Sequence, residues 1–312
     1  MSIGLAVIGC GNVAKMHLQE IDYRVRLEIA CSRRSSKASE YAANFGFRKH
    51  TNTLNDILID KNVDAVIICT PNESHHKIAK KCLMANKHIL IEKPFTNYLS
   101  HAKELIDIAE EKNRIIMVGH ILRHFEVFRR AKEIIHTIGK PIMATDTRIG
   151  FKKPKKWWLE EERFLLLFQG THSFDILCWL VSSRPKKLLA STDSIRKEFI
   201  GEDTFSACLL YDNFRANINH SFSSSHKKNE IIIIGSKKTI RIVDYEKLYI
   251  DDKLILHDRS CVSHPFTSQM QEFVDSLING REPTSSGKDA LVSQQIIESC
   301  YLSKGKLIEV KK

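Results

Sequence analysis

The stretch that decides the fold lies near the N-terminus, where Ile3–Ile8 (IGLAVI) is followed by Gly9-Cys10-Gly11-Asn12-Val13-Ala14. The short apolar run is typical of a strand buried on both faces, and a helix-like stretch follows the glycines. In this setting Gly9 permits a tight turn, Gly11 lets the backbone approach a pyrophosphate, and Ala14 allows close packing of helix on strand. Free N–H groups at the helix start favour an anion. The segment is therefore predicted to bind a dinucleotide.

The same alternation of strand and helix continues over the first 120 residues. Further apolar, strand-like runs occur at 26–31, 63–69, 88–91 and 115–118, and helix-like stretches separate them. Strands separated by helices indicate parallel βαβ units and hence a doubly wound sheet. We therefore expect residues 1–120 to form a dinucleotide-binding Rossmann domain.

The pattern changes in the rest of the chain. Strand-like stretches with turn signals between them follow one another from residue 187 to residue 256, and closing helices are expected at 267–278 and 290–304. Consecutive strands with short turns are typical of antiparallel sheet. We expect residues 121–312 to form an α+β domain with an open, largely antiparallel sheet, so the whole chain is of the α/β class. A length of 312 residues also suggests two domains.

The composition excludes several classes of protein. Hydrophobic residues make up 43% and charged residues 27% of the chain, as in ordinary globular proteins, which excludes collagen-like, low-complexity and disordered chains. No apolar run approaches the roughly 18 residues of a membrane helix, and no signal sequence is recognisable. We therefore expect a cytoplasmic protein without a membrane partner. The eight cysteines form no C-x-x-C, which favours reduced core thiols over disulfides or a metal site.

The net charge of +11 raises the question of which anionic partner the protein binds. The basic clusters are short and dispersed, without zinc-finger spacing or an aromatic-rich RNA motif, so nucleic acid is not expected. One cluster, Ser32-Arg33-Arg34, follows the second strand. An NAD-binding unit usually carries Asp or Glu there, whereas a hydroxyl and two guanidinium groups accept a 2′-phosphate. This favours NADP, with NAD still possible if the arginines are merely solvated.

Several short motifs occur in an order found in one family of enzymes. They are Thr70-Pro71-Asn72 with His75-His76, Glu92-Lys93-Pro94, Val118-Gly119-His120, Gln169-Gly170-Thr171-His172 and Gly280-Arg281-Glu282-Pro283. Together with the glycine loop they resemble the Gfo/Idh/MocA oxidoreductases, which include glucose–fructose oxidoreductase, inositol dehydrogenase and many sugar-nucleotide dehydrogenases. The resemblance covers nearly the whole chain.

This resemblance implies where the cofactor binds. In the family the loop matched by Thr70–Asn72 passes beside the nicotinamide ribose, and Glu92 and Lys93 lie at the carboxyl end of a strand, where doubly wound sheets place their ligands. The residues expected to bind the cofactor are Gly9, Gly11, Asn12, Val13, Ser32, Arg33, Arg34, Thr70, Pro71, Asn72, His75, Glu92 and Lys93.

The resemblance also implies two catalytic residues. The lysine matched by Lys93 hydrogen-bonds the substrate oxygen that undergoes redox chemistry, and an ammonium group can stabilise a developing alkoxide. His172 matches the catalytic histidine, which exchanges the hydroxyl proton. Asp175 lies on the same helix face and either orients His172 or caps a turn. Many family members carry an Asp four residues before the histidine, where this chain has Phe168. That departure leaves the substrate and the direction of reaction open.

Two further features are candidates for substrate binding. Arg123 either binds a substrate carboxylate or phosphate, or pairs structurally with an acid such as Glu126. The segment Lys152–Trp158 (KKPKKWW) carries four lysines and two indoles. Either it holds a diphosphate and stacks a ring on Trp157, or it is a solvated loop with a tryptophan packed beneath it. Lys93, Arg123, Trp157 and His172 are thus the expected substrate-binding residues.

The sequence therefore predicts an NADP(H)-dependent oxidoreductase that interconverts a hydroxyl and a ketone on a sugar or sugar nucleotide. Alternatives are an NAD(P)-linked dehydrogenase of a free sugar, polyol or related cyclic substrate, and a non-catalytic cofactor-binding regulator on the same fold. Because the family commonly uses its open sheet for dimer or tetramer contacts, we also expect a homo-oligomer.

Overall fold

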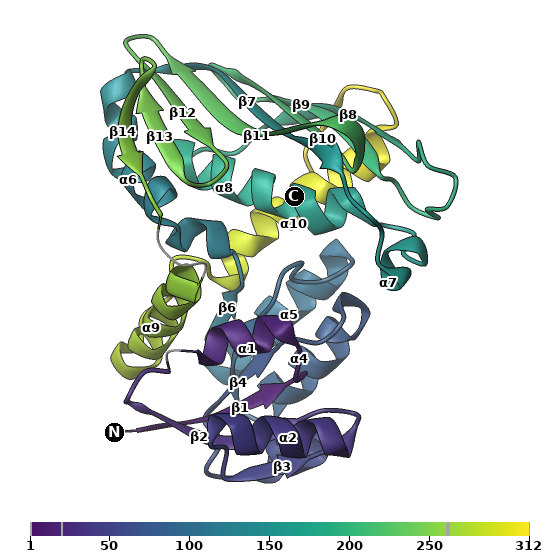
Figure 1. Ribbon diagram of the computed structural model, residues 1–312, viewed down its shortest axis with the longest axis vertical. Coiled ribbons are helices and arrows are strands. Elements are labelled where there is room, and N and C mark those ends of the chain that lie inside the picture. The colour runs from purple at the N-terminus through teal and green to yellow at the C-terminus, as the bar shows by residue number, and fades with distance from the viewer. Residues whose placement is uncertain (1, 20, 260–262, 312) are drawn as a thin grey trace. The chain divides into compact units, whose positions relative to one another are not determined.

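The computed structural model describes residues 2–19, 21–259 and 263–311, and these form two compact units (Figure 1). The first comprises Met1–Ile121 and Cys261–Leu291, and the second comprises Leu122–Ser260 and Val292–Lys312. The sequence analysis expected one boundary near residue 120. In the structure the first unit also contains a segment from near the C-terminal end of the chain.

The first unit is built on a six-stranded sheet in the order β3-β2-β1-β4-β5-β6, in which every neighbouring pair is parallel. This confirms the doubly wound sheet. The strands are β1 (Ile3–Ile8), β2 (Val25–Cys31), β3 (Lys49–Thr51), β4 (Ala65–Ile68), β5 (His88–Ile91) and β6 (Ile116–Val118). All residues of β1 and β4 are buried, because helices cover both faces of the sheet. With three residues, β3 is too short to show a pattern in the sequence.

Helices on the two faces form two separate hydrophobic clusters. One face packs against α1 (Asn12–Leu18), α2 (Ser35–Phe45) and α9 (Ser263–Asn279), and the other against α3 (Leu54–Ile59), α4 (His75–Met84) and α5 (Leu99–Lys112). Helix α9 contributes Met270, Phe273 and Val274 to the same cluster as Leu5 and Val7 of β1. These buried side chains explain why a segment distant in sequence belongs to the first unit.

The second unit contains a nine-stranded sheet in the order β14-β13-β12-β11-β7-β10-β9-β8-β15. Its strands are β7 (Pro141–Phe151), β8 (Lys187–Asp193), β9 (Thr204–Leu210), β10 (Arg215–Ser221), β11 (Ser223–Gly235), β12 (Thr239–Val243), β13 (Lys247–Ile250), β14 (Lys253–His257) and β15 (Ile308–Glu309). Only the pair β7 and β10 is parallel among the strands described. The largely antiparallel sheet is thereby confirmed.

The helices of this unit are α6 (Glu126–Ile134), α7 (Lys156–Leu159), α8 (Thr171–Val181) and α10 (Gly287–Ser303), and the division between the units falls within α10. Figure 1 shows α6 and α8 on one face of the sheet. Burial alternates along β7, since Ala144, Asp146 and Arg148 are buried whereas Met143 and Phe151 are exposed. This alternation is typical of a sheet with only one covered face.

Some absences hold for the described part of the chain. None of its helices combines the length and the apolar character that a membrane span requires. Its seven cysteines are free thiols, whereas Cys261 lies outside the described residues. No three His, Cys, Asp or Glu side chains come together there in a way that could hold a metal ion.

The acid stability of the first unit is expected to depend on His88, the first residue of β5. Burial, followed by the positive charge of Arg114, lowers the pKa of His88 from 6.5 to about 4. Below about pH 6.5 the unfolded chain protonates His88, whereas the folded protein does not until the pH approaches 4. The contribution of neutral His88 to the free energy of unfolding is therefore complete at neutral pH and is lost as the pH falls towards 4. The contribution is on the order of 3 kcal/mol.

We therefore predict that His88→Asn makes the free energy of unfolding less dependent on pH between 6.5 and 4. Urea unfolding at several pH values in this range measures the effect. His50→Asn removes an exposed histidine from the same unit and serves as the control. An unchanged pH dependence in His88→Asn would contradict this assignment.

Candidate cofactor and active site

The turn after β1 forms because Gly9 adopts a left-handed conformation, with φ at +100°. The backbone of Gly9 donates to the carbonyl of Cys31 at 2.9 Å, and the N–H of Cys69 donates to the carbonyl of Ile8 at 2.8 Å. A Cβ on Gly9 would lie 2.5 Å from the carbonyl oxygen of Cys69, far inside contact distance. Only glycine fits this position.

Gly11 plays a different part in the same loop. It is the N-cap of α1, no side chain caps the helix, and a Cβ built on Gly11 meets no atom within 4 Å. The hydroxyl of Tyr41 donates to its carbonyl at 3.1 Å and holds the loop from behind. The start of α1 therefore presents N–H groups to open space, which suits a phosphate group.

The glycine loop opens into a pocket of about 810 Å³ at the carboxyl edge of the sheet, a size typical of ligand sites. The pocket brings together seven residues that were predicted to bind the cofactor, namely Gly9, Gly11, Ser32, Arg33, Arg34, Thr70 and Pro71. Lys37 and Asn52 also line it, and the sequence analysis did not identify them. Lys37 lies on α2, three residues after Arg34, the N-cap residue of the helix. The spacing of side chains on a helix could therefore have identified Lys37 from the sequence. This set of residues fits the adenosine phosphate end of a dinucleotide.

The other predicted cofactor residues of the first unit do not line this pocket. Val13 is 39% exposed on α1, next to Asn12. The Nδ2 group of Asn72 donates to Oδ1 of Asn97 at 2.9 Å. The role of these residues in binding the cofactor stays a prediction.

His75 lies behind the cofactor loop and connects it to the loop that carries Lys93. Its Nδ1 atom is 2.9 Å from the carbonyl oxygen of Pro94, and its Nε2 atom is 2.9 Å from that of Thr70. Only 1% of the residue is exposed. Burial lowers the pKa of His75, although hydrogen bonds to the two carbonyls and the charge of Glu92 act in the opposite direction. From this position His75 supports both loops.

Glu92 and Lys93 follow β5 at the same edge of the sheet. Nε2 of His17 lies 2.8 Å from Oε1 of Glu92, and the backbone N–H of Lys93 donates to Oε2 at 3.2 Å. Burial opposes ionisation of Glu92, but the hydrogen bond with His17 and the charges of His17 and Lys93 outweigh it, so the pKa lies below its usual value. A Cβ on Gly119 would lie 3.0 Å from this carboxylate. Glycine in the Val118–His120 motif therefore leaves room for an ionised Glu92.

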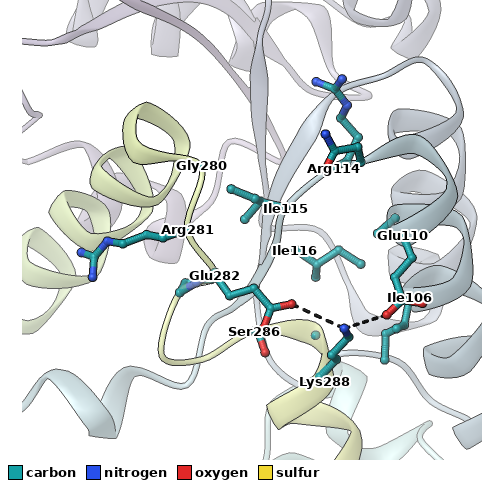
Figure 2. Close-up of a pocket in the computed structure, with 14 residues that line it drawn as sticks. Ile106, Glu110, Arg114, Ile115, Ile116, Gly280, Arg281, Glu282, Ser286 and Lys288 are labelled. Carbon is teal, nitrogen blue, oxygen red and sulfur yellow. Dashed lines mark ion pairs between the residues drawn. The ribbon is translucent and has the colours of Figure 1, made fainter.

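A second, smaller pocket of about 190 Å³ lies in the first unit at the amino end of β6, away from the carboxyl edge (Figure 2). The loop Gly280–Pro283 forms one wall of it. The ammonium group of Lys288 points into the pocket between two carboxylates, 2.7 Å from Glu110 and 3.7 Å from Glu282. These ion pairs and the small volume indicate a structural role for the C-terminal motif.

His172 belongs to the second unit, whereas Lys93 belongs to the first. His172 is half-buried near the start of α8, and a five-residue π-helix, Leu166–Gly170, leads into that helix. Short π-helical segments are frequent at functional sites. A Cβ on Gly170 would lie 3.1–3.3 Å from the side chains of Phe174, Leu166 and Phe205, so these side chains would have to shift by a few tenths of an ångström.

The carboxylate of Asp175 forms a two-pronged ion pair with Arg123. Nε of Arg123 lies 3.0 Å from Oδ2 and Nη2 lies 2.5 Å from Oδ1, and both side chains are almost completely buried. Glu126, the acid considered as a partner in the sequence analysis, pairs instead with Arg129. The structure thus shows a structural partner for Arg123, and substrate binding by Arg123 stays a prediction.

Phe168 belongs to a cluster of aromatic side chains in the second unit. Its ring lies 5.7 Å from that of Trp157, 5.9 Å from that of Trp158 and 5.8 Å from that of Phe164, measured between centroids. Trp158 is 7% exposed, whereas Trp157 is 41% exposed. Phe168, at the position where the resemblance implied an acid, therefore contributes to an apolar, aromatic wall four residues before His172.

Comparisons with known proteins agree with this architecture. The model of an oxidoreductase family with a NAD-binding Rossmann fold, GFO/IDH/MocA, matches residues 3–120, and the model of the GFO/IDH/MocA C-terminal domain matches residues 128–241. The oxidoreductase YhhX of Escherichia coli is 30% identical over 246 residues, which cover 76% of this chain and 70% of that protein. Myo-inositol 2-dehydrogenase of Thermotoga maritima is 22% identical over 305 residues, 91% of each chain.

Solved structures of other proteins share this fold. An oxidoreductase from Agrobacterium radiobacter, crystallised with NAD+, L-tartaric acid and magnesium, superimposes with a TM-score of 0.89 at 21% identity and covers 99% of both chains.

The two glycines of the loop give a matched test of the cofactor pocket. We predict that Gly11→Ala leaves thermal stability nearly unchanged but lowers the affinity for the dinucleotide at least tenfold, because the added methyl group occupies the open space before α1. Gly9→Ala should lower stability itself, since its Cβ meets the Cys69 carbonyl. Thermal unfolding and titration with NADPH and NADH measure the two effects. Normal cofactor affinity in Gly11→Ala would show that the phosphates bind elsewhere.

Proposed function

Because this chain belongs to the Gfo/Idh/MocA family of oxidoreductases, we propose that it transfers a hydride between NADP(H) and a hydroxyl-bearing carbon of a sugar, polyol or sugar nucleotide. The observation that carries the proposal is the pocket in which the glycine loop faces Ser32, Arg33, Arg34 and Lys37. A relative that spans most of the chain is named as a dehydrogenase of myo-inositol, a cyclic polyol, which supports a polyhydroxylated substrate.

The charge of the pocket supports NADP. Three cations line it (Arg33, Arg34 and Lys37), against one carboxylate, that of Glu73. Ser32 stands where NAD-binding units usually present an acid to the ribose hydroxyls, and its backbone donates to Thr51 at 3.1 Å, so the β2 terminus is held in place. A 2′-phosphate would meet guanidinium groups there instead of a carboxylate, with charge-assisted hydrogen bonds.

The proposed chemistry assigns one role to each of two residues. The nicotinamide ring, when bound, accepts or supplies the hydride. The ammonium group of Lys93 binds the oxygen of the reacting carbon and stabilises negative charge on it. His172 takes or returns the hydroxyl proton. Because position 168 is a phenylalanine, no carboxylate from that position takes part in the proton transfer. Catalysis therefore depends on Lys93 and His172.

We also propose that the protein forms a homo-oligomer, a dimer or a tetramer, through the open face of the nine-stranded sheet. Met143 on β7 is 42% exposed, and Ile234 on the neighbouring β11 is 37% exposed. Paired subunits would cover such apolar side chains.

The cofactor preference has a direct test. We predict that Arg33→Ala/Arg34→Ala raises the KM for NADPH about 10- to 100-fold, while the KM for NADH changes less than about threefold, because only NADPH carries the 2′-phosphate. The control is Arg129→Ala/Arg130→Ala, which removes an adjacent pair of exposed arginines from α6. Equal losses for both cofactors would argue against the proposed phosphate site.

The catalytic roles are tested on a panel of keto-sugars and polyols, with NADPH oxidation or NADP+ reduction as the readout. We predict that Lys93→Ala and His172→Gln each lower kcat by about 10²–10⁴, the usual range for a proton-transfer residue, and that His172→Gln weakens the binding of NADPH by less than about threefold. If NADPH binds tightly but no substrate turns over, and Lys93→Ala changes nothing, the protein is instead a cofactor-binding regulator.

A further inference from the structure

We propose that the segment Lys152–Trp158, here called the lysine–tryptophan loop, binds a nucleoside diphosphate, with the base stacked on Trp157 and the phosphates on the lysines. The inference rests on the proposed function, because the nucleotide would be the non-reacting part of a sugar-nucleotide substrate. It commits to one of the two interpretations that the sequence leaves open for this loop. Everything that supports it lies within the second unit.

The first observation is a prepared aromatic surface. Trp157 stands edge-on to Trp158, Phe164 and Phe168, with centroid distances of 5.9, 6.3 and 5.7 Å. Beneath it, Trp158 stacks on Phe222 at 5.2 Å. The buried indole of Trp158 is thus the one that packs under the loop, whereas Trp157 stays 41% exposed although three rings hold it in place. A fixed, partly exposed indole is the kind of surface on which nucleobases stack.

The second observation is that the backbone of the loop is anchored. The N–H of Lys152 donates to the carbonyl of Phe222 at 3.0 Å, and Nη2 of Arg196 donates to the carbonyl of Lys152 at 3.0 Å. The guanidinium group of Arg196 in turn lies over the rings of Phe151 and Phe199, 4.9 and 4.7 Å from their centroids. These contacts hold one end of the loop against the aromatic cluster.

The third observation is uncompensated positive charge. The four lysines of the loop are exposed, and among the described residues no carboxylate lies within ion-pair distance of any of them. Some other lysines of this chain do have an acidic partner, such as Lys49 with Asp60, so it is the clustering of four unpaired lysines that distinguishes the loop. Lys155 places its ammonium group 5.7 Å from the centre of the Trp158 ring, so cation and indole lie side by side. Clustered ammonium groups without partners favour a phosphate ligand.

The ring of Phe168 connects the lysine–tryptophan loop to the segment that leads into the helix of His172. Phe168 lies in the π-helix four residues before His172, and the ring of Trp157 lies 5.7 Å from that of Phe168. A substrate whose sugar reaches His172 would therefore pass its anomeric phosphates along Phe168 towards the lysines and its base towards Trp157. Phe168 adds an apolar face for the sugar ring.

The test is calorimetric titration of UDP into the full-length protein saturated with NADP+, so that the cofactor pocket is already filled. We expect Trp157→Ala to weaken UDP binding at least tenfold and Trp157→Phe to weaken it less than about threefold, because the phenyl ring still stacks. Lys153→Gln/Lys156→Gln should weaken UDP binding and reduce its dependence on salt. Uridine and pyrophosphate, titrated separately, should each bind at least tenfold more weakly than UDP.

Two control variants match these changes. Tyr23→Ala removes an exposed aromatic ring from the first unit, and Lys237→Gln/Lys238→Gln removes two exposed lysines from the turn between β11 and β12. Neither should change the affinity for UDP. The inference is overturned if UDP does not bind at millimolar concentration, or if it binds equally well to the wild type, Trp157→Ala and Lys153→Gln/Lys156→Gln.

The outcomes also separate this inference from the proposed function. Turnover of a free sugar or polyol that Trp157→Ala leaves unchanged, together with absent UDP binding, upholds the oxidoreductase and rejects the nucleotide site. Binding of UDP that depends on Trp157 and the lysines, with no hydride transfer on any substrate, upholds the nucleotide site and rejects the oxidoreductase.

Discussion

The close approach of two strand ends at Gly9 is the constraint on which the cofactor site depends. Because β1 lies between β2 and β4, the chain leaving β1 must turn within hydrogen-bonding distance of Cys31 and within contact distance of the Cys69 carbonyl. A positive φ and the lack of a side chain satisfy both conditions. The start of α1, the end of β2 and the Thr70 loop then line a single pocket. A bulkier residue would have to push these strand ends apart.

The sequence was most informative where local chemistry determines local structure. The glycine loop could be recognised because its turn, its helix start and its neighbouring strands leave a pattern within about 30 residues. Ser32, Arg33 and Arg34 could be placed near it because parallel strands end at the same edge of the sheet. The structure brings these residues into one pocket with Gly9 and Gly11. Lys37 was missed, although helical spacing from Arg34 points to it.

Contacts between segments that are distant in the chain could not be predicted in this way. Nothing in the apolar pattern of α9 says that Met270 and Phe273 pack in the same cluster as β1. The contact of His17 with Glu92 joins residues 75 apart, and the pair of Arg123 with Asp175 joins residues 52 apart. A single sequence without an alignment carries no signal for such pairs, because each partner alone looks like an ordinary polar residue.

The positive charge of the chain is unevenly distributed between paired and unpaired cations. Many of the cations are neutralised where they stand, as Lys288 is by Glu110 and Arg148 is by Asp146. These pairs are already counted in the net charge of +11, so they leave it unchanged, but they determine where the unpaired cations lie. The cations that matter for recognition are the uncompensated ones that are held beside a shaped surface. Arg33 and Arg34 meet this condition beside the glycine loop, and the lysines of the lysine–tryptophan loop meet it beside Trp157. Both places suit small phosphorylated ligands, because each group of cations is compact and the two belong to different units.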